Sequence, residues 1–579
     1  MFLTARDRVE RYVANGYWGD LTVDGLFQQA CALGGDGLAL VDPANRERLD
    51  QVTPERLSWT QLCDGVERLC AALLELGLVK DDIICVQLPN TVDAVMTFLA
   101  AARLGLVISP VVMQYRDHEM AYILDQIAPA AYITVPRFHG FDHVRMAAHL
   151  LQGRTGVRLL SFGDGGAAAI DLRDIARAAD PSRVAPVVAK APTLAAEVLT
   201  ICWTSGTEAR PKGVPRDHNH WLVNARVISE ASSLRDGEIL LNPFPLVNIG
   251  SIGGLVMPWL WHHGVLVLHH PFDLGVFLGQ IAAERVTYTI AAPAILTAWL
   301  KQPALLAKAD LSSLRAIASG SAPLSPWLIE GFADRFGIEV CNVFGSNEGC
   351  SLFSGPTHVQ DHAQRARYFP RFGADGVSWP GEAARINRTR LADPVTEADI
   401  TEPNRPGELR IDGASVFSGY WQKSGELARS AFDELGYFRT GDIFEIAGEG
   451  ELARFYRFVG RHKEIIVRGG VNISPAEIDD LLVGQAMIQE AAVVGIPDAD
   501  LGERVALAVV PKDGIAPTLD DIAAWLDQQG VARFKRPERL VIVDALPRNA
   551  MNKVVRRDLR ARVLAELETE NSLDRAGNS

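Results

Sequence analysis

The chain has 579 residues, a formal net charge of −14 at pH 7, and 48% hydrophobic residues. This length exceeds what one hydrophobic core holds, so we expect at least two domains. The composition is typical of a globular α/β protein, and the negative charge argues against nucleic-acid binding. The seven cysteines form no CxxC pair, which favours free thiols in a reducing compartment over metal ligands.

No segment resembles a targeting signal or a membrane span. The N-terminal stretch "MFLTARDRVERYV" lacks an apolar signal core. The most membrane-like stretch, residues 252–268, is interrupted by Pro258 and by His262–His263–Gly264. A membrane helix needs about 18 uninterrupted apolar residues. We therefore expect a cytoplasmic protein that does not enter a membrane.

The first 320 residues alternate between helical and strand patterns. Apolar residues at helical spacing predict a helix over 59–76, ended by Gly77, and a second over 91–105. Short buried strands are expected at 82–88, 106–112, 158–162, 264–270, 286–292 and 314–320. Such alternation favours parallel sheets covered by helices. After about residue 400 the pattern changes to short strands and turns, and a further unit of about 100 residues follows.

Residues 204–213 read "TSGTEARPKG" and follow a strand-like run over 194–203. Hydroxyl and glycine residues in such a turn can direct successive N–H and O–H groups to one point, and Lys212 adds a positive charge. This arrangement favours a loop that holds the β- and γ-phosphates of a nucleotide. It is not a P-loop, because GxxxxGK[ST] is absent. Taken alone, the stretch could equally be a surface turn.

Four further motifs follow: "VFGSNEG" (343–349), "YFRTGD" (437–442), "GRHKEIIVRGG" (460–470) and "PRNAMNK" (547–553). Together with residues 204–213 they resemble, in order, the motifs of the adenylate-forming superfamily, from about Thr60 to Leu559. This superfamily contains acyl- and aryl-CoA synthetases, adenylation domains of peptide synthetases and beetle luciferases. The resemblance implies that the chain uses ATP to activate a carboxylic acid.

The same resemblance implies an α/β fold with two domains. The large N-terminal domain, residues 1–459, would contain parallel-rich sheets layered with helices and a β-subdomain that binds ATP and the acid. A hinge over 460–463 would lead to a small mobile α+β domain over 464–565. The polar residues 566–579 are expected to form a flexible tail.

Individual residues can be assigned to the nucleotide. The Phe344 ring suits stacking on adenine, and the Glu348 carboxylate suits Mg²⁺. Outside this motif order, Phe344 would be interpreted as a core residue and Glu348 as a surface acid. Asp442 resembles the residue that accepts hydrogen bonds from both ribose hydroxyls, although a turn cap is the alternative. Arg461 is implied as a ribose–phosphate contact.

The resemblance makes Lys463 the hinge and Lys553 the group that bridges the acid carboxylate and the α-phosphate. The alternative is that Arg461 and Lys463 are charged residues of an exposed turn, and that Lys553 is a solvated lysine. Gly469 and Gly470 form a turn that could admit a pantetheine arm. The remaining residues implied in nucleotide binding are Thr204, Ser205, Gly206, Thr207, Ser321, Ala322, Pro323 and Gly345, with Thr207 also a candidate Mg²⁺ ligand.

These residues imply a reaction in two steps. The carboxylate attacks the α-phosphate of ATP to give an acyl-adenylate and pyrophosphate, and a thiol then displaces AMP to form a thioester. The expected thiol is CoA, and the runner-up is the phosphopantetheine of a carrier protein loaded by a stand-alone aryl-acid adenylating enzyme. A nucleotide-binding pseudo-enzyme is the third possibility, but the intact charged residues oppose it. The protein is expected to be a monomer or a homodimer.

Four segments depart from the family pattern, one of them at two positions, where Glu208 and Ala209 replace the last two residues of the usual TTG. Asn347 replaces the usual Thr, so its phosphate contact is expected to differ. Glu208 places an acid beside the phosphates, presented outward, and Ser321 replaces a common glycine. Asn552 stands before the bridging lysine and tolerates positive φ better than most residues. None of these changes removes a charged catalytic group, so we expect activity.

The acid is expected to be aromatic or alicyclic. Some stretches resemble 2,3-dihydroxybenzoate–AMP ligases, and others resemble bacterial ligases that attach CoA to cyclic acids. Asn248 aligns with an asparagine that aryl-acid ligases use near an ortho-hydroxyl, although a satisfied core amide is the alternative. Small neighbours are expected to leave volume for the ring. The predicted acid-binding residues are Asn248, Ile249, Gly253 and Gly320.

Overall fold

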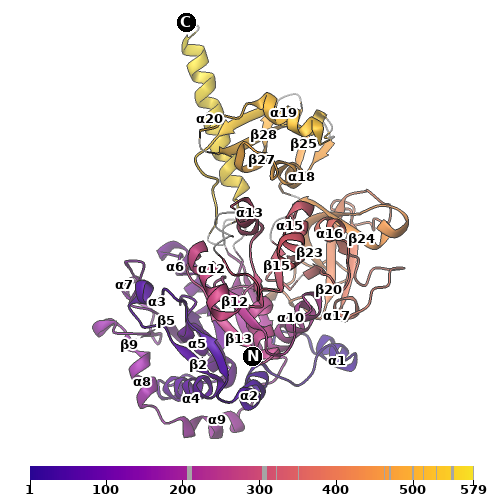
Figure 1. The fold of residues 1–579 in the computed structure, drawn as a ribbon. Helices are drawn as coiled ribbons and strands as arrows, with labels where there is room; N and C mark the ends of the chain where they lie inside the picture. Colours follow the sequence, from indigo (N-terminus) through magenta and orange to yellow (C-terminus); the bar gives the residue numbers. More distant parts are fainter. Residues whose placement is uncertain are drawn as a thin grey trace.

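The structure is a computed structural model (Figure 1). It describes residues 1–204, 211–302, 309–320, 323–349, 351–461, 463–468, 471–498, 501–512, 514–529, 531, 533–549 and 553–577. Most of the chain forms a large body, and the segment after Arg461 forms a smaller one, drawn in yellow above it in Figure 1. The predicted α/β class and the pairing of a large with a small unit are confirmed.

Two large, mainly parallel sheets form the centre of the large body. In order across the first sheet, the strands are β17 (Ser351–Ser354), β16 (Glu339–Gly345), β15 (Ala316–Gly320), β14 (Tyr288–Ile290), β12 (Ile239–Asn242), β13 (Val265–Leu268), β1 (Leu38–Val41) and β2 (Arg56–Ser58). In the second they are β22 (Leu427–Ala428), β21 (Tyr420–Trp421), β11 (Gly213–Asp217), β10 (Val198–Trp203), β4 (Val107–Pro110), β3 (Ile83–Val86), β5 (Ala131–Thr134), β8 (Arg158–Ser161) and β9 (Ile170–Asp171).

Helices pack on both faces of each sheet. The helices between the sheets are α2 (Val23–Gly34), α4 (Trp59–Glu75), α5 (Val92–Leu104), α10 (His218–Ala231) and α11 (Met257–Trp261). The outer face of the first sheet packs against α12 (Leu274–Glu284), α13 (Pro293–Lys301) and α15 (Pro326–Phe336). The outer face of the second packs against α6 (Asp117–Ile127) and α7 (His143–Leu150).

Neighbouring residues of a strand can belong to different cores. Along β1, Leu40 lies in the central core while Val41 packs against the outer helices. Along β3, Ile84 faces the central core while Cys85 belongs to the outer core. This alternation follows from the two-residue period of a strand, and it explains why strands covered on both faces are apolar throughout.

A five-stranded antiparallel sheet forms the side of the large body that leads to the small one. Its strands are β18 (Tyr368–Pro370), β24 (Phe455–Arg461), β23 (Phe438–Ile446), β20 (Gly407–Gly413) and β19 (Asn387–Ala392). The small body has its own sheet and its own apolar clusters. Its elements are β25 (Ile466–Arg468), β26 (Val471–Ile473), α18 (Pro475–Leu482), β27 (Ile488–Asp498), β28 (Gly502–Pro511), α19 (Leu519–Gln528), β29 (Arg539–Ile542) and α20 (Arg556–Gly577).

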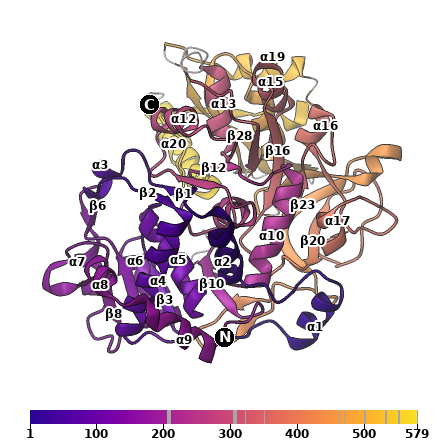
Figure 2. The same cartoon turned by 60° about the horizontal axis from the view of Figure 1, so that its bottom comes forward.

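The N-terminal segment is fastened to the antiparallel sheet. The helix α1 (Arg6–Ala14) lies beside α17 (Glu382–Ile386) in Figures 1 and 2. The buried Arg8 guanidinium donates to the carbonyl oxygens of Gly413, Val416 and Phe417, at 3.2, 2.8 and 3.2 Å. These hydrogen bonds join residues more than 400 positions apart in the sequence.

Most predicted elements of the first 320 residues agree with the structure to within about two residues at each end, but the strand-like run expected over 194–203 begins only at Val198, as β10. The stretch 252–268 forms the π-helical turn η3 (Ile252–Val256), α11 and β13. Among the described residues, no helix is both long and apolar enough to cross a membrane. Residues 566–577, expected to be a flexible tail, continue α20 as far as Gly577.

Candidate active site

A cavity of about 2260 Å³ lies where the two bodies meet. The parallel strands β12, β14, β15 and β16 direct their carboxyl ends toward it, because the residues that follow or end these strands line the cavity. The antiparallel sheet contributes Asp442 and Arg461, and the small body contributes Glu464 and Lys553. Ligands of α/β proteins bind at this edge of a sheet.

The ends of the predicted phosphate loop are held together. The Thr204 N–H donates to the Lys212 carbonyl at 3.0 Å, and the Lys212 N–H donates to Thr204 Oγ1 at 3.1 Å. Both residues line the cavity. The predicted contacts Ser205, Gly206 and Thr207, and the departure at Glu208, lie outside the described residues.

Glu348 is held by an aromatic residue that also lies near Lys212. Its Oε1 accepts a hydrogen bond from the Tyr420 hydroxyl at 2.7 Å, and its backbone carbonyl accepts from the Phe417 N–H at 2.8 Å. The Lys212 ammonium lies 5.0 Å from the centre of the Tyr420 ring. Tyr420 thus joins two predicted catalytic residues. The sequence analysis missed this tyrosine because no motif marks it.

The chemistry of Glu348 fits a hard divalent cation. Its carboxylate is largely buried and faces the cavity, and carboxylate oxygens are ligands that Mg²⁺ accepts. Among the described residues, no group of three or more His, Cys, Asp or Glu side chains is arranged to hold a metal ion. A cation at Glu348 would therefore take further ligands from phosphate oxygens and water, as Mg²⁺ does in nucleotide sites.

Phe344 is both packed in an aromatic cluster, as a core residue would be, and accessible from the cavity, as a residue that stacks on adenine would be. Its ring packs edge-on against Phe444, with ring centres 5.0 Å apart, and belongs to a cluster with Phe369 and Phe458. It remains partly exposed to the cavity, as does Gly345 after it. The cluster fixes the ring orientation, so one face is available to a planar ligand.

Asp442 and Arg461 are opposite each other in the register of β23 and β24. The Arg461 Nε lies 3.4 Å from Asp442 Oδ1, and the Asp442 N–H donates to Thr440 Oγ1 at 3.1 Å. Burial raises the pKa of Asp442 to about 6, against the opposing effect of the Arg461 charge. The two predicted ribose contacts therefore form one ion pair, which the motif order alone did not predict.

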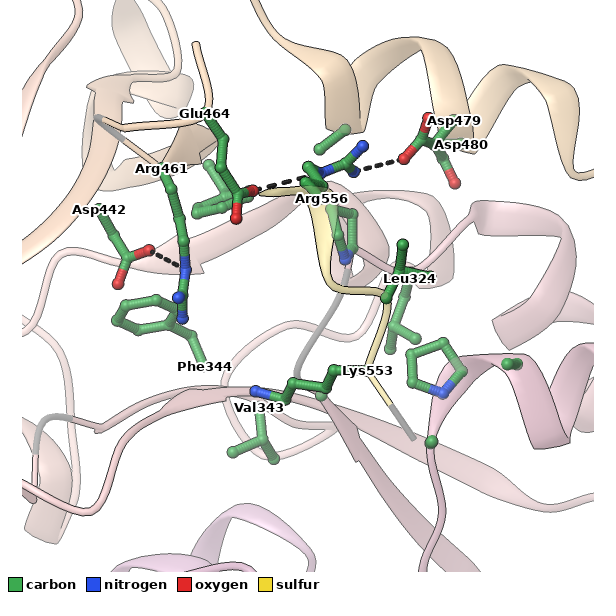
Figure 3. Close-up of a pocket in the computed structure, with 18 of the residues that line it drawn as sticks. Leu324, Val343, Phe344, Asp442, Arg461, Glu464, Asp479, Asp480, Lys553 and Arg556 are labelled. Carbon is green, nitrogen blue, oxygen red and sulfur yellow. Dashed lines mark hydrogen bonds and ion pairs between the residues drawn. The ribbon is translucent and has the colours of Figure 1, made fainter. Parts of the chain in front are cut away.

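Lys553 enters the cavity from the small body, close to Val343 and Phe344 (Figure 3). Burial lowers its pKa to about 8; the Arg461 charge lowers it further, while Asp442 and Glu464 oppose the shift. Its loop is closed by Asn549, whose N–H donates to the Lys553 carbonyl at 2.9 Å and whose Oδ1 accepts from the Lys553 N–H at 3.0 Å. Asn552, the neighbouring departure, lies outside the described residues.

Arg556 connects the lysine loop to three other segments of the small body (Figure 3). Its Nε lies 3.2 Å from Glu464 Oε2, and its terminal nitrogens contact the carboxylate of Asp479 and the carbonyl of Val493. The sequence analysis did not single out Glu464 or Arg556. The local pattern around Arg556, a run of basic residues, is typical of a solvated helix face, whereas Arg556 is largely buried.

The predicted acid pocket adjoins the same cavity. Asn248 is only 4% exposed, and its Oδ1 accepts from the Ser251 N–H at 3.0 Å, so the side chain caps the turn that begins η3. Asn248, Ile249, Gly253 and Gly320 all line the cavity. The predicted residues are therefore brought together, and the capping bond supports a structural contribution of Asn248 as well.

The small residues near Asn248 line the cavity, and some of them also permit close packing. A Cβ at Gly254 would lie 2.4 Å from Ile290 Cδ1, and one at Gly253 would lie 3.2 Å from Ile249 Cγ1. At Gly320, a Cβ would lie 2.0 Å from the Val343 carbonyl oxygen. These glycines allow η3 and β15 to approach their neighbours closely.

The remaining predicted site residues divide into two groups. Pro323 and Lys463 line the cavity, with Lys463 two positions after Arg461 at the passage into the small body. Ser321, Ala322, Gly469 and Gly470 lie outside the described residues.

Comparison with known proteins defines the class to which this fold and cavity belong. Residues 27–421 match the model of the family described as AMP-binding enzyme, and residues 477–553 match the AMP-binding enzyme C-terminal domain. The first match alone covers more than half of the chain. The chain therefore belongs to the AMP-binding enzyme family and is an adenylate-forming enzyme.

Relatives are similar over almost the full length. An indoleacetate–CoA ligase from Aromatoleum aromaticum is 32% identical over 512 residues, 88% of this chain and 93% of the relative. A salicylyl-CoA synthase / salicylate adenylyltransferase from a Streptomyces species is 29% identical over 569 residues, 96% of each chain. The crystal structure of ATP-bound MatB from Rhodopseudomonas palustris superimposes with a TM-score of 0.76 at 25% identity, covering 94% of this chain and 99% of that one.

Proposed function

We propose that the protein is an AMP-forming acid–CoA ligase that activates an aromatic or alicyclic carboxylic acid through an acyl-adenylate. The observation that carries this proposal is the convergence of Lys212, Glu348, Asp442 and Lys553 on one cavity, although they come from four distant segments. ATP and CoA would be the co-substrates, and Mg²⁺ the metal. An enzyme that takes ATP and CoA from the cytoplasmic pools would work in the cytoplasm.

In the first half-reaction, one carboxylate oxygen of the acid attacks the α-phosphorus of ATP, and the bond to pyrophosphate breaks. Lys553 would neutralise the two anions that must meet, and a fixed charge in a desolvated site is effective because it needs no reorganisation. Lys212 would hold the phosphates that leave. Asp442 would accept hydrogen bonds from the ribose. Bound at Glu348, Mg²⁺ would supply charge neutralisation at the phosphates.

In the second half-reaction, a thiol attacks the acyl carbon of the adenylate, and the bond to AMP breaks. In the structure Lys553 shares the cavity with Asp442 and Arg461, and this supports an arrangement suited to the first step. We propose that residues 464–565 rotate about a hinge at 460–463, with Lys463 as the pivot, to withdraw Lys553 and admit the thiol. Residues 1–459 would remain as the fixed domain.

The acceptor and the acid are supported by the names of the relatives. CoA is favoured because both relatives are named as CoA-thioester-forming enzymes, whose acids contain aromatic rings. The alternative is a carrier-protein phosphopantetheine, which the second name of the Streptomyces relative, salicylate adenylyltransferase, keeps in consideration.

Pyrophosphate exchange over a panel of benzoates, arylacetates and cyclohexanecarboxylate tests the first step. AMP release with CoA, or with a phosphopantetheinylated carrier protein, then tests the acceptor. We expect exchange with at least one cyclic acid and AMP release that depends on CoA. Exchange without any CoA-dependent release would favour the carrier, and no exchange with any acid would contradict the proposed function.

A further inference from the structure

Both ends of the Asn347 carboxamide are bound within the protein. Its Oδ1 accepts a hydrogen bond from the Ile249 N–H at 2.9 Å, and its Nδ2 donates to the Trp203 carbonyl at 3.3 Å. Its backbone carbonyl accepts from the buried Arg216 guanidinium at 3.3 Å. The residue is therefore fixed at three points, although it lines the cavity.

These hydrogen bonds join two parts of the proposed site. Ile249 follows Asn248 directly and belongs to the loop that leads into η3. Trp203 is the last residue of β10 and precedes Thr204, where the phosphate loop begins. A threonine at position 347 has one polar side-chain atom on a shorter chain, so it could not reach both partners as the carboxamide does.

We propose that Asn347 is a positioning residue that sets the acid-binding loop against the phosphate-loop strand. It thereby determines where the acid carboxylate lies relative to the α-phosphate. This inference rests on the proposed function of the site. A bond between two separately folded segments matters for such a reaction, because a displacement of about 1 Å between reactants can cost about 10²-fold in rate.

Two substitutions separate the contacts. Asn347→Leu keeps the size but removes both hydrogen bonds, and we expect the KM for the acid to rise about 10-fold or more, with the KM for ATP within about threefold of wild type. Asn347→Asp keeps the acceptor for the Ile249 N–H. It loses the donor to the Trp203 carbonyl and sets a carboxylate oxygen against that carbonyl. The KM for the acid should therefore rise, but less than in Asn347→Leu, and the KM for ATP should rise because the added charge lies beside Glu348 and the phosphates.

Asn219→Leu is the matched control. Asn219 is buried, and its Oδ1 likewise accepts a backbone hydrogen bond, from the Gly19 N–H at 3.1 Å, but it does not line the cavity. This variant should lower the melting temperature without changing the KM for the acid relative to the KM for ATP. If Asn347→Leu changed both KM values equally, as a general loss of stability would, the positioning role would be wrong.

Hydrogen exchange provides a readout that does not depend on turnover. Amide exchange of the peptide containing Ile249 should be faster in Asn347→Leu and near the wild-type rate in Asn347→Asp. Unchanged exchange in Asn347→Leu would overturn the inference. If wild-type protein activated no acid in the panel, the proposed function would fail, while the exchange result would still decide whether Asn347 holds this loop.

Discussion

Asp442 and Lys553 have pKa values displaced toward each other, to about 6 and about 8, because both are buried in one cavity. Under the proposed function each is needed in its charged form, because Asp442 would accept hydrogen bonds from the ribose hydroxyls and Lys553 would neutralise two anions. The neutral pH range is therefore where both groups carry the charge that the first half-reaction needs.

We predict a bell-shaped pH dependence of kcat/KM for pyrophosphate exchange. Activity should fall as the pH drops below about 6, where Asp442 becomes protonated, and as it rises above about 8, where Lys553 loses its proton. Lys553→Arg should remove the alkaline fall, because a guanidinium stays protonated. A wild-type profile that is flat between pH 5 and pH 9 would contradict this assignment.

Asn248 provides a test of specificity. We expect Asn248→Ala to lower kcat/KM more for ortho-hydroxylated aryl acids than for benzoate. The difference should correspond to roughly 1–3 kcal/mol of transition-state stabilisation, since the ortho-hydroxyl would lose its partner in the pocket. Loss of the cap to Ser251 should also lower the free energy of unfolding by about 0.5–2 kcal/mol. Kinetics with the matched acids separate the two effects: an equal fall for both acids would leave only the structural one.

The motifs predicted the charged residues that converge on the cavity. This was possible because the order of the motifs and the residue types within them are typical of enzymes that bind ATP and activate a carboxylic acid. The supporting residues could not be predicted in this way. Tyr420, Glu464 and Arg556 act through contacts with segments far away in the sequence, and nothing in their own neighbourhoods indicates burial. Asn347 was noticed as a departure, but its two partners became visible only in the structure.

At the scale of elements, periodicity predicted the helices and strands of the large body well, because these are covered on one or both faces by a core. It could not predict that 252–256 would be a π-helical turn, which depends on close contact between Gly254 and Ile290. Nor could it place β24 beside β23, the pairing that brings Arg461 to Asp442.

Lys463, which lies where the chain passes from strand β24 into the small body, should act as a pivot. We expect Lys463→Pro to keep pyrophosphate exchange near wild type and to block thioester formation from a supplied acyl-adenylate, since proline restricts φ. Lys553→Ala is the reciprocal control: it should lose exchange by about 10²–10³-fold and still convert the supplied adenylate. Equal loss of both half-reactions in either variant would remove the corresponding role.

The junction of α20, α18, β27 and Glu464 at Arg556 should stabilise the small body. Arg556→Met would leave the carboxylates of Glu464 and Asp479 without this partner, and we expect it to cost about 3–5 kcal/mol of unfolding free energy. Arg557→Met is the matched control, because the neighbouring side chain is 71% exposed and pairs only at the surface. Its effect should stay within about 0.5 kcal/mol. Denaturant unfolding that gave equal effects for the two variants would contradict the junction.

For the whole molecule, the resemblance predicted the two-body architecture and the class of enzyme from motif order. It could not predict how the two bodies are oriented relative to each other, because the same local sequence is compatible with more than one relative orientation. The structure brings Lys553 and Asp442 to one cavity, and under the proposed function this arrangement would suit adenylate formation.

The attachment of α1 through Arg8 has a consequence for the order in which the protein folds during synthesis. Its carbonyl partners at Gly413, Val416 and Phe417 leave the ribosome roughly 20–80 s after Arg8, at about 5–20 residues per second. During that interval α1 has no docking site, and a chaperone or the solvent must accommodate it. Because the Phe417 N–H supports Glu348, the segment on which α1 docks also contributes to the candidate active site, and it is synthesised long after α1.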